Sequence, residues 1–133
     1  MADILDLIAQ AIAKFEGFGD PGKIPTTHNN PGDIREWGHQ PIVKGYVQFS
    51  TVEEGWTALR HQVEKNVARG LTFLEFFAGK PGVYAGFSPG ADGNHPRAYA
   101  QFVVGRLNES LGTAFTPDTV IVETMTRPLA GSW

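Results

Sequence analysis

The sequence predicts a mainly helical α+β domain with a small antiparallel sheet early in the chain. Apolar residues recur at helical spacing in several segments, and each segment is bounded by Gly or by a capping pattern. The region between the first two of these segments instead carries strand and turn signals. With 133 residues, 41% of them hydrophobic, the chain is long enough for one core and too short for two. We therefore expect a single domain over residues 1–133.

The first predicted helix covers residues 3–16. Ile4, Ile8 and Ile12 form an i, i+4 ridge, and Gly17 ends the helix. Glu16 occupies the next position of the apolar ridge, which is an unusual place for a charge.

Residues 17–33 are rich in Gly, Pro, Asn and Thr and predict a long ordered loop. Residues 34–37 are a short strand candidate, and residues 41–43 and 46–49 predict a hairpin around Lys44-Gly45.

Two capping boxes begin the next helices. Thr51-x-x-Glu54 precedes helical spacing up to Gly70, and Thr72-x-x-Glu75 opens a short helix that Gly79 closes.

Residues 79–95 predict a loop, and Asn94 or His95 caps a last helix that starts at Pro96 and ends by Gly112. Thr116-Pro117 is a candidate start for one further short element.

The bulk composition narrows the class of function. A net charge of −3 argues against a nucleic-acid partner. The absence of Cys excludes a thiolate metal site, and the four His residues lack zinc-ligand spacing, so we expect neither metal nor cofactor. No apolar run reaches about 18 residues, so we expect no membrane span. We also expect a monomer.

The N-terminal segment is unlike a signal peptide, because Asp3 and Asp6 fall inside its amphipathic pattern. A substrate outside the cytoplasm would therefore require another export route, a phage origin, or a leader already removed.

Glu16 is the strongest candidate for a functional residue. A carboxylate that continues an apolar ridge is drawn towards the core, where desolvation raises its pKa, and the negative end of the helix dipole acts in the same direction. A carboxylic acid that stays protonated near neutral pH suits the general acid of glycosidic bond cleavage. The alternative is a helix-end carboxylate turned to solvent.

Four segments in this order carry a resemblance to a known family: Glu16-Gly17-Phe18, residues 29–34 (NNPGDI), residues 49–51 (FST) followed by 55–59 (GWTAL), and Pro96-x-x-Tyr99. Together they resemble the lysozyme-like superfamily, in particular small bacterial and phage peptidoglycan-cleaving domains related to soluble lytic transglycosylases and goose-type lysozymes. The resemblance implies that Glu16 is the catalytic acid, that residues 29–34 line the cleft, and that Tyr99 faces Glu16. Its substrate would be the glycan strands of peptidoglycan.

Two departures from the family pattern leave the mechanism open. Gly17 stands where transglycosylases usually have Ser, and Asp33 stands where many relatives have Asn. An inverting hydrolase needs a base about 6.5–9.5 Å from the acid and a retaining one a nucleophile at about 5–5.5 Å, whereas a transglycosylase needs neither. Asp33, or less directly Glu36, is the candidate second carboxylate.

The remaining candidates each have a structural alternative. The amides of Asn29 and Asn30 suit sugar hydroxyls and N-acetyl groups, but Asn also favours turns. Trp37 and Tyr46 are candidates for stacking on sugar rings, although most aromatics in a small domain are core. Tyr99 is expected to bond Glu16 or the bound sugar at the floor of a cleft between the first helix and the sheet, or else a backbone carbonyl within the core.

Three functions remain open at this point. The chain is a muramidase or lytic transglycosylase, a non-catalytic peptidoglycan-binding module of the same fold, or a structural component of a phage tail or secretion assembly.

Overall fold

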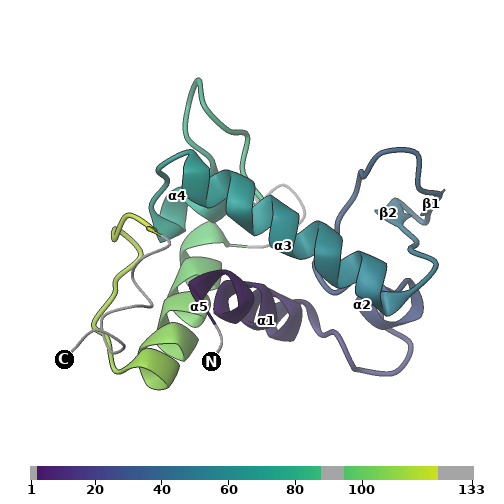
Figure 1. The fold of residues 1–133 in the computed structure, drawn as a ribbon, viewed down its shortest axis with the longest axis horizontal. Coiled ribbons are helices and arrows are strands. Elements are labelled where there is room, and N and C mark those ends of the chain that lie inside the picture. The colour runs from purple at the N-terminus through teal and green to yellow at the C-terminus, as the bar shows by residue number, and fades with distance from the viewer. Residues whose placement is uncertain (1–2, 88–94, 123–133) are drawn as a thin grey trace.

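The computed structural model describes residues 3–87 and 95–122 of the chain (Figure 1). Its elements are, in order, α1 (Ile4–Glu16), α2 (Ile24–Thr27), β1 (Ile42–Val43), β2 (Tyr46–Val47), α3 (Val52–Ala68), α4 (Phe73–Ala78) and α5 (Pro96–Leu111). The predicted class, a mainly helical α+β chain with a small antiparallel sheet, is confirmed.

The helix starts follow from local capping. Thr51 accepts a hydrogen bond from the backbone N–H of Glu54 and the Glu54 side chain accepts one from that of Thr51, and Thr72 and Glu75 repeat the arrangement. Both predicted capping boxes are therefore confirmed. His95 precedes α5 without a side-chain cap, and the alternative cap Asn94 lies outside the described residues.

The end of α1 explains why Gly follows Glu16. Gly17 adopts φ 88°, and its N–H donates to the Lys14 carbonyl while that of Phe18 donates to the Ala13 carbonyl at 3.0 Å. This pair of bonds is a Schellman motif, which needs a left-handed residue and hence favours Gly.

The hairpin forms where Lys44-Gly45 predicts it. Ile42 pairs with Val47 and Val43 with Tyr46, and both turn residues have positive φ, 56° and 85°, as a type I′ turn requires. Each strand is only two residues long, so the hairpin is shorter than predicted.

The strand predicted over residues 34–37 is wrong. The N–H of Val47 donates to the Ile34 carbonyl at 2.9 Å, but no ladder follows in the described chain. Ile34 and Trp37 instead pack against a small cluster of Val47, Phe49 and Ala58, which accounts for their apolar character.

The predicted loop over residues 17–33 contains the short helix α2, which the sequence analysis did not predict. At the other end of the chain, Thr116-Pro117 begins a turn rather than a helix or strand. The segment after it pairs with the start of α4, since Phe73 N–H donates to the Thr119 carbonyl at 3.1 Å and Ile121 N–H to the Leu71 carbonyl at 2.9 Å.

The main core lies where α1 packs on α3 and α5, and where α4 packs on α5. The hairpin region joins this core through the first turns of α3 (Figure 1). Gly55 permits this junction, because a Cβ there would lie 2.0 Å from the Asn29 carbonyl oxygen. Within residues 3–87 and 95–122, no helix combines the length and the apolar character that crossing a bilayer demands.

Candidate active site

Glu16 and Tyr99 meet although they lie 83 residues apart in the chain. Glu16 is the half-buried last residue of α1, and Tyr99 is a fully buried residue in the first turns of α5. The Tyr99 hydroxyl donates to Oε2 of Glu16 at 2.6 Å. The predicted contact between these two residues is confirmed, and the alternative of a bond from Tyr99 to a backbone carbonyl is not what the structure has.

Two phenyl rings hold the Tyr99 ring between them. Phe15 of α1 stacks on one side with ring centroids 3.9 Å apart, and Phe77 of α4 is also stacked on it at 4.1 Å. The interplanar angles are 19° and 16°, so the three rings are close to parallel. Since these rings come from three helices, the position of the Tyr99 hydroxyl is set by the packing of the whole core.

The electrostatics of Tyr99 make it a fixed donor. Burial raises its pKa well above 10.0, and the charge of Glu16, the hydrogen bond to Glu16 and the charge of Asp33 raise this pKa further. The phenol therefore stays neutral at physiological pH and keeps its proton directed at Glu16. The charge of Asp33 makes the smallest contribution to this shift, and it is what relates Asp33 to the Glu16–Tyr99 pair.

The hydrogen bond from Tyr99 fixes the role of one oxygen of the Glu16 carboxyl. Oε2 accepts the Tyr99 bond whether the carboxyl is neutral or ionised. Tyr99 therefore holds the Glu16 carboxyl in one orientation in either protonation state.

Asn30 organises the loop that carries Asp33. Its side chain is fully buried, and its Nδ2 donates to the carbonyls of Ile34 at 2.9 Å and Val47 at 2.8 Å. Its Oδ1 accepts the Ile34 N–H at 2.9 Å. Both amide hydrogens are used inside the fold, which favours the turn interpretation of Asn30 over sugar binding.

Asn29 and Asp33 share an uncommon backbone conformation, with φ 53° at both positions. Asn and Asp tolerate this left-handed region better than most residues. The Asn29 side chain is half-buried and donates to the Phe49 carbonyl at 3.1 Å, while Asp33 is half-buried near Tyr99. Glu36, the other carboxylate considered, is exposed.

The aromatic residues predicted to stack on sugars lie beside the hairpin. Trp37 is half-buried with its ring edge-to-face on His61 at 5.5 Å. The hydroxyl of Tyr46 accepts a bond from Nη2 of Arg35 at 3.0 Å. Their stacking role stays a prediction, as does that of Asn29 in sugar binding.

Sequence reasoning missed Phe15 and Phe77 as supports of the site. Phe15 is next to Glu16 in the sequence, and this position could have indicated its role. No sequence pattern relates Phe77 to Tyr99. It also missed His28, which is buried and whose Nε2 donates to the Val43 carbonyl at 3.0 Å, tying the loop before Asn29 to the hairpin.

The described residues contain no group of three or more His, Cys, Asp or Glu side chains that could hold a metal ion. Comparison of the chain with protein-family models, with curated proteins and with solved structures gives no match.

Proposed function

We propose that this chain cleaves peptidoglycan glycan strands between N-acetylmuramic acid and N-acetylglucosamine, with Glu16 as the general acid. The bond from a buried, neutral Tyr99 to Glu16 is the observation that carries the proposal. A carboxyl group at a helix end needs no such support for stability, but a catalytic acid must be held in one orientation. The resemblance to lysozyme-like domains in segments that include both residues supports the same function.

In the proposed reaction, Glu16 gives its carboxyl proton to the glycosidic oxygen as the bond from that oxygen to the sugar C1 breaks. The oxocarbenium-like sugar is then captured by a nucleophile. When the substrate's own hydroxyl attacks, the ionised Glu16 takes the proton that this hydroxyl loses. When Asp33 activates a water as base, Asp33 takes the proton of that water, and Glu16 is reprotonated from solvent. Tyr99 keeps its own proton throughout and holds Oε2, so it acts by positioning.

Asp33 decides between two versions of this reaction. Its charge contributes to the raised pKa of the Tyr99 hydroxyl that contacts Glu16, which supports a role for Asp33 in the same reaction. If Asp33 activates a water, the product has a reducing end and the enzyme is a muramidase. If the substrate's own hydroxyl attacks, the product is an anhydro sugar and the enzyme is a lytic transglycosylase.

The test is mass spectrometry of muropeptides released from purified peptidoglycan by the wild-type chain and by Glu16→Gln. Gln keeps the shape of the side chain but has no transferable proton, so release should fall by at least about 10²–10⁴-fold. Glu109→Gln, an exposed position on α5, is the matched control and should release product as the wild type does.

Three outcomes separate the alternatives. Anhydro or reducing ends in a Glu16-dependent product identify transglycosylase or hydrolase. Wall binding without release by the wild type would indicate the non-catalytic module. Near-wild-type release by a normally folded Glu16→Gln would remove Glu16 from the acid role.

A further inference from the structure

A second cavity lies between α1 and α3 and contains neither Glu16, Tyr99 nor Asp33. It has a volume of about 310 Å³ and is lined by Asp6, Ala9, Gln10, Trp56, Thr57 and Arg60. This volume is at the lower end of the range of small-molecule sites, about 300–1,000 Å³. We call it the α1–α3 groove.

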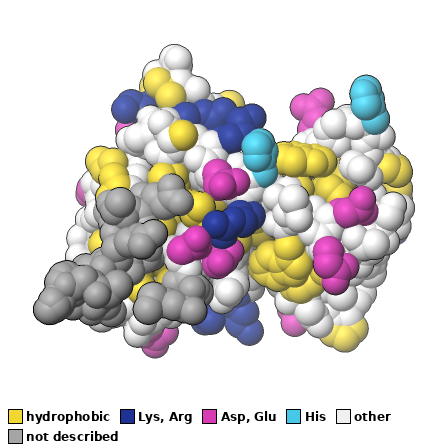
Figure 2. Space-filling model, in the orientation of Figure 1, with side chains coloured by type: hydrophobic (Ala, Val, Ile, Leu, Met, Phe, Trp, Pro, Cys, Tyr) yellow, Lys and Arg dark blue, Asp and Glu magenta, His cyan; other side chains and the backbone are white. Residues whose placement is uncertain are grey.

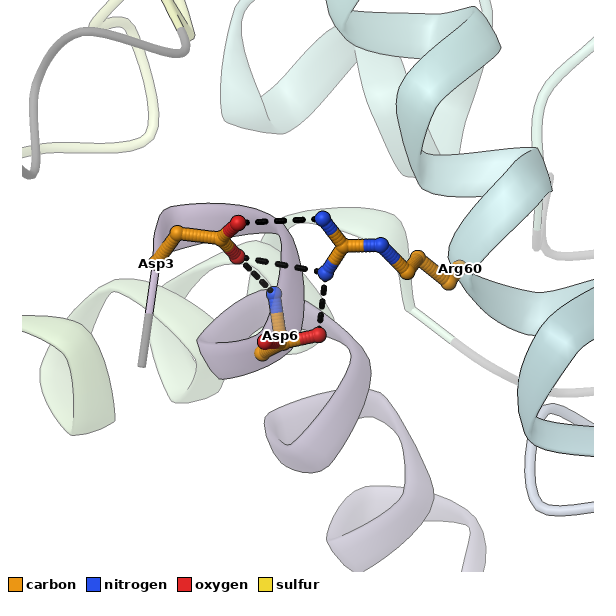
Figure 3. Close-up of polar contacts among 3 residues, drawn as sticks. All are labelled: Asp3, Asp6 and Arg60. Carbon is orange, nitrogen blue, oxygen red and sulfur yellow. Dashed lines mark hydrogen bonds and ion pairs between the residues drawn. The ribbon is translucent and has the colours of Figure 1, made fainter. Parts of the chain in front are cut away.

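An ion-pair network of Asp3, Asp6 and Arg60 lies at the rim of the groove (Figure 3). Arg60 of α3 donates through Nη1 and Nη2 to the two oxygens of Asp3, at 3.2 and 3.0 Å, and through Nη1 to Asp6. Asp3 also caps α1 by accepting the Asp6 N–H at 2.9 Å. The rim therefore presents one guanidinium and two carboxylates to the mouth of the groove.

The remaining lining combines an aromatic face with exposed hydrogen-bonding groups. Trp56 is half-buried and contacts Phe18 edge-to-face at 5.5 Å. Gln10 and Thr57 are exposed on the two helices that flank it. Figure 2 shows hydrophobic, acidic and basic side chains next to one another on the face where α1 and α3 meet.

We infer that the α1–α3 groove is a binding site for one neutral N-acetylated hexose ring. An indole packs on the apolar face of a pyranose, and carboxylate, amide, hydroxyl and guanidinium groups bond its hydroxyls and acetamido group. Two carboxylates against one guanidinium leave the rim with a net negative charge, which disfavours a carboxylated sugar. The groove thus fits N-acetylglucosamine rather than N-acetylmuramic acid.

The choice of a saccharide rests on the proposed function, but binding in the groove does not require cleavage. A second contact of this kind would keep the enzyme on a polymer between cuts. An experiment can therefore distinguish a failure of groove binding from a failure of the proposed function.

The experiment is an NMR titration of the full chain carrying Glu16→Gln with the neutral trimer of N-acetylglucosamine. Saturable shifts are expected at the Trp56 indole N–H, the Gln10 side-chain amide and the Thr57 backbone. Gln10→Ala should weaken binding at the groove about fivefold, the value of one hydrogen bond. Gln101→Ala, at an exposed position of α5, should leave it unchanged.

Trp56→Phe, which keeps an aromatic ring in the core, should also weaken the groove shifts, and N-acetylmuramic acid should produce weaker shifts than N-acetylglucosamine. Absent or non-saturating shifts at these groups would overturn the inference. Groove shifts that respond to neither Gln10→Ala nor Trp56→Phe would also overturn it. Groove shifts that a stem peptide produces and the trimer does not would overturn it as well. Cleavage of cell walls by the wild-type chain is measured separately, so a loss of groove binding can be told apart from a loss of activity.

Discussion

Tyr99→Phe isolates the contribution of one hydroxyl, because the ring that Phe15 and Phe77 sandwich is kept. The substitution removes the 2.6 Å bond to Glu16 and creates no large cavity. A hydrogen bond contributes about 0.5–1.5 kcal/mol between neutral groups and about 1.5–3 kcal/mol when one group is charged. Because Glu16 is half-buried, water can replace part of the lost hydrogen bond. We therefore expect the free energy of unfolding to fall by about 1–2 kcal/mol.

For a chain of 133 residues, a loss of that size corresponds to a fall in Tm of about 3–7 °C. Turnover should fall further than stability suggests, by roughly 10–100-fold, because a misplaced acid transfers its proton inefficiently. The assays are a thermal melt and release of muropeptides at a temperature well below the lower Tm.

Val104→Ala is the matched control, since it truncates a buried residue of α5 without touching the Tyr99 hydroxyl. It should lower stability by about 1–3 kcal/mol and leave turnover near the wild-type value. Equal losses of turnover in the two variants would show that stability alone explains the effect. Unchanged turnover in Tyr99→Phe would refute the positioning role.

Three further predictions concern Asp33, two glycines and the pH dependence of stability. The Asp33→Asn variant should fold normally, because Asn tolerates φ 53° equally well. Its turnover should fall about 100-fold or more only if Asp33 acts as base or nucleophile. A large loss of turnover together with anhydro products would contradict this account. Gly55→Ala should destabilise the fold by more than about 3 kcal/mol in urea unfolding, whereas Gly105→Ala, where a Cβ meets nothing within 4 Å, should stabilise it by about 1 kcal/mol. Because the folded-state pKa of Tyr99 is raised above 10.0, its contribution to stability is intact below about pH 10 and is lost as the pH rises towards the raised value. Urea unfolding at pH 9 and 11 should therefore show a steeper loss for the wild type than for Tyr99→Phe, by up to about 1.4 kcal/mol per pH unit, and equal slopes would contradict the shift.

The features that sequence predicted well are those decided by a few neighbouring residues. Thr51 with Glu54 and Lys44 with Gly45 specify a helix start and a turn through local backbone chemistry. The error at residues 34–37 has the opposite origin. Apolar side chains there serve a contact between loop and α3, and such a segment has the same pattern as a short strand.

The site was predictable in part. Glu16 on an apolar ridge and Tyr99 in register with a buried helix face both point inward, and the resemblance pairs them. The stacking of Tyr99 between Phe15 and Phe77 and the hydrogen bonds of Asn30 were not predictable, because each depends on distances between segments far apart in the chain. Asn30 illustrates this, because the sequence of a turn residue does not differ from that of a sugar-binding residue. Only the hydrogen-bond partners of its amide distinguish the two.

The separation of 83 residues between Glu16 and Tyr99 has a consequence for biosynthesis. At about 5–20 residues per second, α5 is translated roughly 4–17 s after α1, and until then the carboxylate lacks the hydroxyl that orients it. Closing so long a loop also places this contact among the slow, non-local steps of folding. The contact between Glu16 and Tyr99 is therefore a property of the folded chain through α5. If the proposed function holds, a nascent or truncated chain that ends before residue 95 should not cleave peptidoglycan.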